Sequence, residues 1–339
     1  FLAVLVVFSI DILLLIFAGV LVGIYLRWMK AHVATLTHLP QGLALALVII
    51  LLVFMAGLSV TLLAPVVENQ ADTIAKELPR SIEKFHSYLL HFSWGDEVAD
   101  STKNPEKLIS GDNGSDWSGL IGPIVGIFST TFGVVGGIVL VVVIGIYVAA
   151  ETDTYFEGLL KLIPIQRRRR ARKILLQLGH TLRWWLLGQS LSMLVLGVSV
   201  FAVLQFLKIP GAIVLALFTA LSTFIPNLGP VIAYVPTALI ALTVSPRHLL
   251  YVTLFYIVIQ NVEGFLITPL VHRKGIAVPP VLIVSVQILL FTLIGFMGVL
   301  LAMPILAITI VMVKMIYIEG ILGDRSESQA ADSQQDGSS

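Results

Sequence analysis

Long apolar segments with almost no charged residues run through most of this sequence. About 20 consecutive apolar residues let a helix cross a bilayer. In lipid every backbone polar group must be satisfied internally, and these runs lack the alternation of a barrel, so we expect helices. The runs are 1–26, 42–65, 120–150, 184–207, 210–225, 230–245, 249–270, 281–294 and 296–318. The sequence therefore predicts an all-α, polytopic integral membrane protein with about 8 spans (7–9).

Composition supports this class and excludes several kinds of site. Only 12% of the residues are charged, against about 25% in soluble domains. The chain has no cysteine, which excludes disulfides, thiolate zinc sites, iron–sulfur clusters and cysteine nucleophiles. The histidines are scattered over loops and span ends, so neither a metal site nor a cofactor is expected.

Charge bias predicts the topology. Residues 151–183 hold eight Lys and Arg against three acids, which places them in the cytoplasm by the positive-inside rule. Residues 66–118 hold ten acids against five basic residues, so we place them outside. The predicted organisation is N-terminal transmembrane helices (1–65), an extracytoplasmic helical segment (66–118), a transmembrane helix (119–150), a cytoplasmic basic amphipathic helix (151–183), a C-terminal transmembrane bundle (184–318) and a disordered cytoplasmic tail (319–339).

The extracytoplasmic segment carries an apolar stripe at helical spacing. Its members are Val67, Ala71, Ile74, Leu78, Ile82, Phe85, Leu89 and Phe92. Pro79 is expected to start a second helix or to kink the first. The stripe is compatible with an oligomer contact, with a gate, or with a helix packed on its own protein.

Two further patterns predict packing and lipid contact. Four arginines at 167–170 favour a helix facing lipid headgroups over a nucleic-acid site. Glycine pairs at i, i+4 permit close helix approach. These pairs are Gly19/Gly23, Gly122/Gly126 and Gly133/Gly137.

The stretch FIPNLGPVIAYVP at 224–236 breaks an apolar region. Irregular backbone is tolerated at membrane depth only where protein or a water cavity covers it. Its candidate solute or ion ligands are Pro226, Asn227, Gly229 and Pro230, since freed carbonyls and an amide can coordinate, as in discontinuous transporter helices. The flanking runs, each about 24 Å long at 1.5 Å per residue, are either short spans or one re-entrant hairpin. A plain loop is the alternative.

The stretch IQNVEGFLITP at 259–269 places polar residues in an apolar helix. Glu263 is the only acid between Glu157 and Glu319, and an ionisable residue at membrane depth costs about 2.5–3.5 kcal/mol, which favours a function. Gln260, Asn261 and Pro269 are further candidates here. Alternatively, Glu263 lies at the cytoplasmic end and pairs with Lys274. The same argument applies with less force to Asp11 in the first span.

The chain has no phosphate-loop motif, G-x-S-x-G, H-E-x-x-H or paired carboxylates, which predicts neither an enzyme nor an ATP-driven pump.

Three stretches, taken in order, resemble the autoinducer-2 exporter family of bacterial permeases. They are LLKLIP…RRRRARKILLQLGHTLRWWLLGQ, TFIPNLGPVIAYVPTALIAL and QNVEGFLITPLV…GIAVPPVLIVSVQILLFTLIGFMGVLLAMPILA. The first stretch ends on Gln189, a further site candidate, and the last carries Gly298, Ala302 and Pro304. The resemblance covers about residues 42–317. The chain departs from the pattern at IGFMG and at Pro279-Pro280.

The resemblance implies a multi-pass, homo-oligomeric transporter of the bacterial inner membrane. It implies export of a small polar solute of the autoinducer-2 type without ATP, or sodium/proton antiport. A non-transporting scaffold acting through residues 66–118 is a third hypothesis. Beyond the bilayer, the expected partners are the solute, a proton or sodium ion and further copies of the chain, without nucleic acid.

Overall fold

The computed structural model describes residues 2–89, 131–264 and 278–322, and this part of the chain is helical without strands. The predicted insertion beyond residue 89, Pro269 and the tail beyond residue 322 lie outside the described residues. In chain order the helices are α1 (Leu2–Thr37), α2 (Gln41–Leu89), α6 (Thr131–Ala150), α7 (Thr152–Lys161), α8 (Ile165–Phe206), α9 (Ala212–Ser222), α10 (Leu228–Val244), α11 (Pro246–Val262), α13 (Pro280–Ile294), α14 (Phe296–Met312) and the π-helix η2 (Val313–Ile318).

Several of these helices are long and apolar enough to cross a membrane. Within the described residues they are Ile10–Thr37, Gln41–Gln70, Ile165–Phe206 and Phe296–Ile318. A fifth span results if Gly136–Ala150 and Thr152–Lys161, bent by 84° at their junction, count as one. Shorter apolar helices are α9, α10 and α13. The predicted all-α polytopic membrane fold is confirmed, and the total of about 8 spans stays a prediction.

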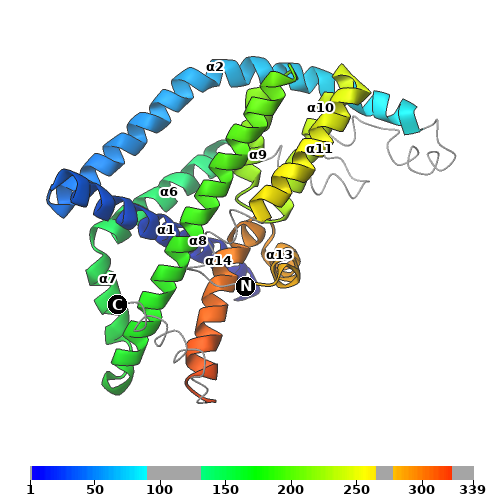
Figure 1. The fold of residues 1–339 in the computed structure, drawn as a ribbon. Helices are drawn as coiled ribbons and strands as arrows, with labels where there is room; N and C mark the ends of the chain where they lie inside the picture. The colour runs from blue at the N-terminus through cyan, green and yellow to red at the C-terminus, as the bar shows by residue number, and fades with distance from the viewer. Residues whose placement is uncertain (1, 90–130, 265–277, 323–339) are drawn as a thin grey trace, which may run out of the picture.

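Helix α8 is a long helix that contributes residues to two of the apolar cores (Figure 1). Its 42 residues extend about 63 Å at 1.5 Å per residue. Its middle turns pack with α1, α13 and α14 in one apolar core, and its last turns pack with α9, α10 and α11 in a second. A third core joins α1, α2 and α6. The predicted boundary at 183/184 thus falls inside one continuous helix.

Helix α2 also crosses a predicted boundary, because it continues unbroken through residue 65 and through Pro79. It passes over the upper ends of α9 and α10 in Figure 1 and packs against both. The Ile213 amide in the first turn of α9 donates to Gln70 Oε1 at 3.0 Å, which satisfies one of the amides that a helix start leaves unpaired. Ile74 packs against the second core. At Ile74, therefore, the stripe packs on its own protein.

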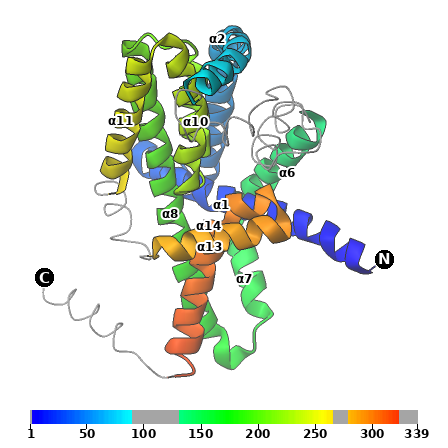
Figure 2. The ribbon, with the colours of Figure 1, turned by 90° about the vertical axis from the view of Figure 1, so that its right-hand side faces the viewer.

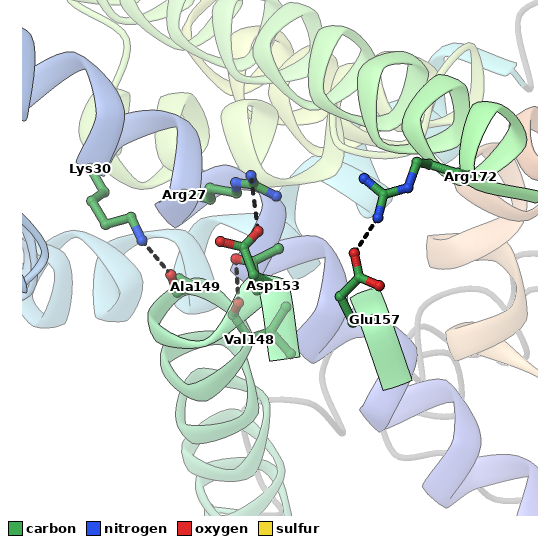
Figure 3. A network of polar contacts seen from close by, with 8 residues as sticks. Arg27, Lys30, Val148, Ala149, Asp153, Glu157 and Arg172 are labelled. Carbon is green, nitrogen blue, oxygen red and sulfur yellow. Dashed lines mark hydrogen bonds and ion pairs between the residues drawn. The ribbon is translucent and has the colours of Figure 1, made fainter. Parts of the chain in front are cut away.

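The break between α6 and α7 is tied to α1 (Figure 3). Lys30 is only 9% exposed, and its Nζ donates to the Ala149 carbonyl at 2.8 Å. A cation near the C-terminal end of a helix is favoured because the last carbonyls there lack partners. Arg27 lies 3.9 Å from Asp153 at the start of α7. The bend thus places two basic residues of α1 against the end of one helix and the beginning of the next.

Three members of the basic segment contact the protein itself. Arg168 donates to the Ile163 and Lys161 carbonyls at 3.0 and 3.3 Å, which closes the turn between α7 and α8. Arg170 donates to the Met315 carbonyl of η2 at 2.6 Å. Arg172 pairs with Glu157 of α7 (Figure 3). These side chains connect the start of α8 to α7 and to η2. The predicted contact with lipid headgroups stays a prediction.

Glycines bring α1 and α6 into close contact, as predicted for Gly19 and Gly23. A Cβ at Gly19 would lie 2.6 Å from Ile144, and one at Gly23 would lie 2.7 Å from Val148. The partner glycine is Gly145, where a Cβ would lie 2.6 Å from Val22. At Gly137 the contact is looser, since a Cβ there would lie 3.7 Å from Leu15. The predicted pair Gly122/Gly126 lies outside the described residues.

We expect Gly145→Ala to destabilise the protein by about 1–3 kcal/mol, because the added methyl overpacks the contact of α6 with α1. Gly136 is the matched control, since it lies on the same helix and a Cβ there would meet nothing within 4 Å. Gly136→Ala should stabilise by up to about 1 kcal/mol through helix propensity. Thermal unfolding of the detergent-solubilised protein checks both. Equal melting temperatures for the two variants would contradict the packing argument.

Two short hairpins complete the fold. Helix α9 has 11 residues, about 16 Å, so the chain turns back beside the middle of α8 before it could cross a hydrocarbon core of about 30 Å. This length favours the re-entrant interpretation of 210–245. Helices α13 and α14 join at Gly295, whose φ is 72°, and Figure 2 shows α13 lying across the direction of α8.

Candidate functional site

The turn between α9 and α10 is a tight, broken backbone segment, the PNLGP tip (226–230). Asn227 precedes α10 with a φ of 65° and a ψ of −45°. This is close to the rare classic γ-turn, and the Leu228 amide closes it by donating to the Pro226 carbonyl. Its side chain is exposed and makes no capping hydrogen bond. A Cβ at Gly229 would lie 1.8 Å from the Ser222 carbonyl oxygen. Only glycine fits there, so the motif specifies this close crossing of α9 and α10.

Two glutamine side chains from other helices donate to carbonyls of the break. Gln189 of α8 donates to the Thr223 carbonyl. Gln287 of α13 donates through Nε2 to the Pro226 carbonyl at 3.0 Å, which also accepts from the Leu228 amide at 2.8 Å. In an uninterrupted helix the donor to Pro226 would be residue 230, which is proline and has no N–H. The two amides thus compensate for backbone bonds that the break removes.

The second predicted motif lies at the end of α11. Glu263 is partly buried there, and the Gln260 amide lies 3.5 Å from its carboxylate. The hydroxyl of Ser192, which is 7% exposed on α8, also hydrogen-bonds this carboxylate. Asn261 is exposed and donates to the Ile257 carbonyl at 2.6 Å. Glu263 is therefore held by neighbours on two helices.

Helix α8 connects the two motifs. Gln189, which donates to the Thr223 carbonyl just before the PNLGP tip, and Ser192, which binds Glu263, are three residues apart and so lie on one helix face. Phe224 beside the tip packs edge-on against Trp185 of α8, with ring centroids 5.6 Å apart. The sequence motifs at 224–236 and 259–269 therefore meet at one stretch of α8.

A groove of about 360 Å³ lies between α10 and α11 and joins residues of both motifs. It is lined by Pro230, Val231, Tyr234, Thr253, Tyr256, Ile257, Gln260 and Asn261. The lining combines apolar surface with a few hydroxyl and amide groups, the usual character of a small-molecule site. None of its side chains is charged, so the groove suits a neutral polar solute better than an ion.

A buried hydroxyl network supports one wall of this groove. The Tyr256 hydroxyl lies 3.0 Å from Thr219 Oγ1 of α9 and 3.3 Å from Thr237 Oγ1 of α10. The Tyr234 hydroxyl lies 2.8 Å from Thr253 Oγ1, and the two tyrosine rings are 5.3 Å apart. Because these hydroxyls bind one another, the groove wall is held in a defined shape.

Not every predicted residue joins the site. Pro226, Asn227, Gly229 and Pro230 form the PNLGP tip, and Gln260 and Asn261 line the groove. Gln189 contacts the break from α8, and Glu263 lies at the end of α11. Asp11 is exposed on α1 and does not line the groove, and Pro269 lies outside the described residues. Sequence reasoning missed Gln287, whose signal is a lone amide in the apolar segment 280–294, and Ser192, since serine is common in membrane helices.

Comparison with known proteins shows which family the chain matches. The family model "AI-2E family transporter" matches residues 1–318. The predicted transport proteins YueF and YrrI of Bacillus subtilis (strain 168) are 25% and 26% identical to the chain, over 80% and 88% of it and 75% and 85% of their own lengths. The predicted transport protein sll0060 of Synechocystis sp. is 21% identical over 84% of the chain and 81% of its own length. The chain is therefore a multi-pass membrane protein that belongs to the AI-2E transporter family.

Proposed function

We propose that the protein exports a small polar solute of the autoinducer-2 type across the bacterial inner membrane without ATP hydrolysis and without catalysing a reaction. The observation that carries this proposal is the groove between α10 and α11, in which the two sequence motifs meet. Family membership supports transport as the activity.

The groove chemistry supports the solute class. Tyr234 and Tyr256 contribute aromatic side chains to its lining. Gln260 and Asn261 contribute amides, which can both donate and accept hydrogen bonds. A compact molecule with several hydroxyl groups could contact both surfaces. Asn227, exposed at the nearby tip, adds a further amide.

Sodium/proton antiport is a second candidate, and Glu263 favours it. This acid lies between α11 and α8 with Ser192 and Gln260 on its carboxylate. Such a group can load and release a proton or bind a cation if access to it alternates between the two sides of the membrane.

Flux measured in proteoliposomes tests the proposal and separates the two candidates. Labelled autoinducer-2 trapped inside should leave vesicles that contain the protein faster than empty vesicles, without ATP. For antiport, an imposed sodium gradient should instead move protons, detected by a trapped pH-sensitive dye. Folded, monodisperse protein without either flux would contradict transport and favour the scaffold hypothesis.

The tip offers a specific test of solute contact. We expect Asn227→Gly to lower flux about fivefold, the equivalent of one lost hydrogen bond of about 1 kcal/mol. Glycine is the appropriate replacement because it keeps the φ of 65°, whereas leucine would add backbone strain. Initial flux per reconstituted protein is the measurement. Gln205→Ala, which removes an exposed amide from α8, is the control, and equal flux in all three proteins would return the tip to a plain loop.

The proposal includes a homo-oligomer in the bilayer. The span Gln41–Gln70 has only 17% of its most apolar window buried within one chain, so most of this window is available to lipid or to a second copy. Multi-angle light scattering of the purified protein measures the number of copies.

A further inference from the structure

Gln287 makes a polar contact between two hairpins that are distant in sequence. Its side chain is fully buried in α13, at 0% exposure, although its neighbours in that helix are almost all apolar. Its Nε2 donates to the Pro226 carbonyl, 61 residues away in the chain. The carbonyl can only accept, so the orientation of this amide is determined by chemistry.

Within the described residues, the Gln287 side chain makes its hydrogen bond through Nε2, to the Pro226 carbonyl. Its Oε1 is buried and has no hydrogen-bond partner among them. Leaving a buried acceptor unpaired is unfavourable, so an apolar side chain of similar volume would suit the packing of α13 better. The hydrogen bond that its N–H group donates to the Pro226 carbonyl explains why this position holds an amide.

The two ends of this contact belong to different units. Helices α13 and α14 form a tight pair, because a Cβ at Gly298 would lie 2.3 Å from the Leu290 carbonyl oxygen. This pair packs in the first core with α1 and α8, whereas α9 and α10 belong to the second. The PNLGP tip lies between these cores, because Phe224 just before it packs in the first core and α10 after it packs in the second. Gln189 donates to the Thr223 carbonyl and Gln287 to the Pro226 carbonyl.

We propose that Gln287 is a positioning residue for transport, whose amide holds the PNLGP tip to the α13–α14 hairpin and so sets the position of the groove wall that begins at Pro230. The inference rests on the proposed function. It makes the tip a hinge between the two cores, and a shift of α13–α14 relative to α9–α10 requires this hydrogen bond to break and form again.

Two substitutions and one control test the role of the amide. Gln287→Met keeps the volume but removes the donor, so we expect flux to fall about fivefold or more. Gln287→Glu can donate only when its carboxyl is protonated, since the ionised form accepts only. Its flux, divided by wild-type flux at the same pH, should therefore rise as the buffer is made more acidic. Gln205→Met replaces an exposed amide on α8 by the same side chain. This control should keep wild-type flux at every pH.

A purely packing role predicts different results. In that case Gln287→Met would equal wild type, and the relative flux of Gln287→Glu would not change with pH. Either result would overturn the proposal. An ionised carboxylate is unfavourable at this buried position, so the folded fraction of Gln287→Glu itself depends on pH. Flux is therefore divided by the amount of folded, reconstituted protein at each pH, and a change in folded protein then cannot imitate the expected rise.

A second measurement does not depend on flux. The chain has no cysteine, so Ser222→Cys at the end of α9 gives a single reporter beside the tip. A water-soluble maleimide should react with it severalfold faster in the Gln287→Met background, while a Ser199→Cys reporter on α8 should react equally in both backgrounds. If wild-type protein shows no flux, the proposed function fails but this comparison still decides the role of Gln287. Equal Ser222→Cys reaction rates would overturn it.

Discussion

Gly229→Ala is expected to abolish most transport and to destabilise the protein by about 3 kcal/mol or more, at the upper end of overpacking effects. A Cβ at this position would lie 1.8 Å from the Ser222 carbonyl oxygen. The obstacle is backbone, which cannot rotate away as a side chain can. The crossing of α9 and α10 must therefore open, which moves the Pro226 carbonyl away from Gln287 and shifts the groove wall at Pro230.

Flux per folded protein and the melting temperature in detergent check this prediction together. The control is Gly179→Ala on α8, where a Cβ would meet nothing within 4 Å. It should be neutral or slightly stabilising, because alanine favours the helix. A Gly229→Ala protein with the wild-type melting temperature and flux would show that the tip does not require this crossing.

The fold class was predictable from the sequence because lipid limits a chain to few structures. Apolar runs of sufficient length specify helices regardless of tertiary context, and the structure confirms them. Boundaries between helices were less predictable. Charge changes sharply near residues 65 and 183, yet α2 and α8 run through both positions. A change in charge does not itself end a helix, and α2 continues even through Pro65 and Pro79.

Individual motifs were easier to predict than their partners. Gly19 and Gly23 were identified by spacing alone, but the glycine that meets them on α6 is Gly145, which belongs to none of the predicted pairs. A small residue permits close approach without specifying which helix approaches.

The same limit applies to the site. Proline and glycine at 226–230 predicted a broken backbone, and the polar residues at 260–263 predicted a second site. Nothing in the local sequence shows that Gln287 donates to Pro226 or that Ser192 binds Glu263, because both contacts join helices distant in the chain. Asn227 was correctly identified as lying in the break, while its exposure depends on how α9 and α10 cross.

Glu263→Gln is expected to have the second large effect, and its form distinguishes the two transport candidates. Glutamine keeps the shape of the side chain and can still accept from Ser192 and Gln260, but it cannot titrate. If the protein is a proton-coupled carrier, the substitution should abolish gradient-driven flux and the pH dependence of transport, while downhill exchange persists. If the protein is an uncoupled exporter, only the apparent affinity for the solute should change.

The decisive measurement is flux against pH for wild type and Glu263→Gln in the same vesicles. Glu157→Gln is the matched control, because it neutralises an acid paired with Arg172 at the half-exposed corner of α7 and α8. Exposed pairs contribute about 0–1 kcal/mol, so this control should leave the pH profile unchanged. Superimposable curves for wild type and Glu263→Gln would remove the carboxylate from the mechanism. They would leave the neutral groove between α10 and α11 as the basis for transport, since none of its lining side chains needs a proton to bind a polar solute.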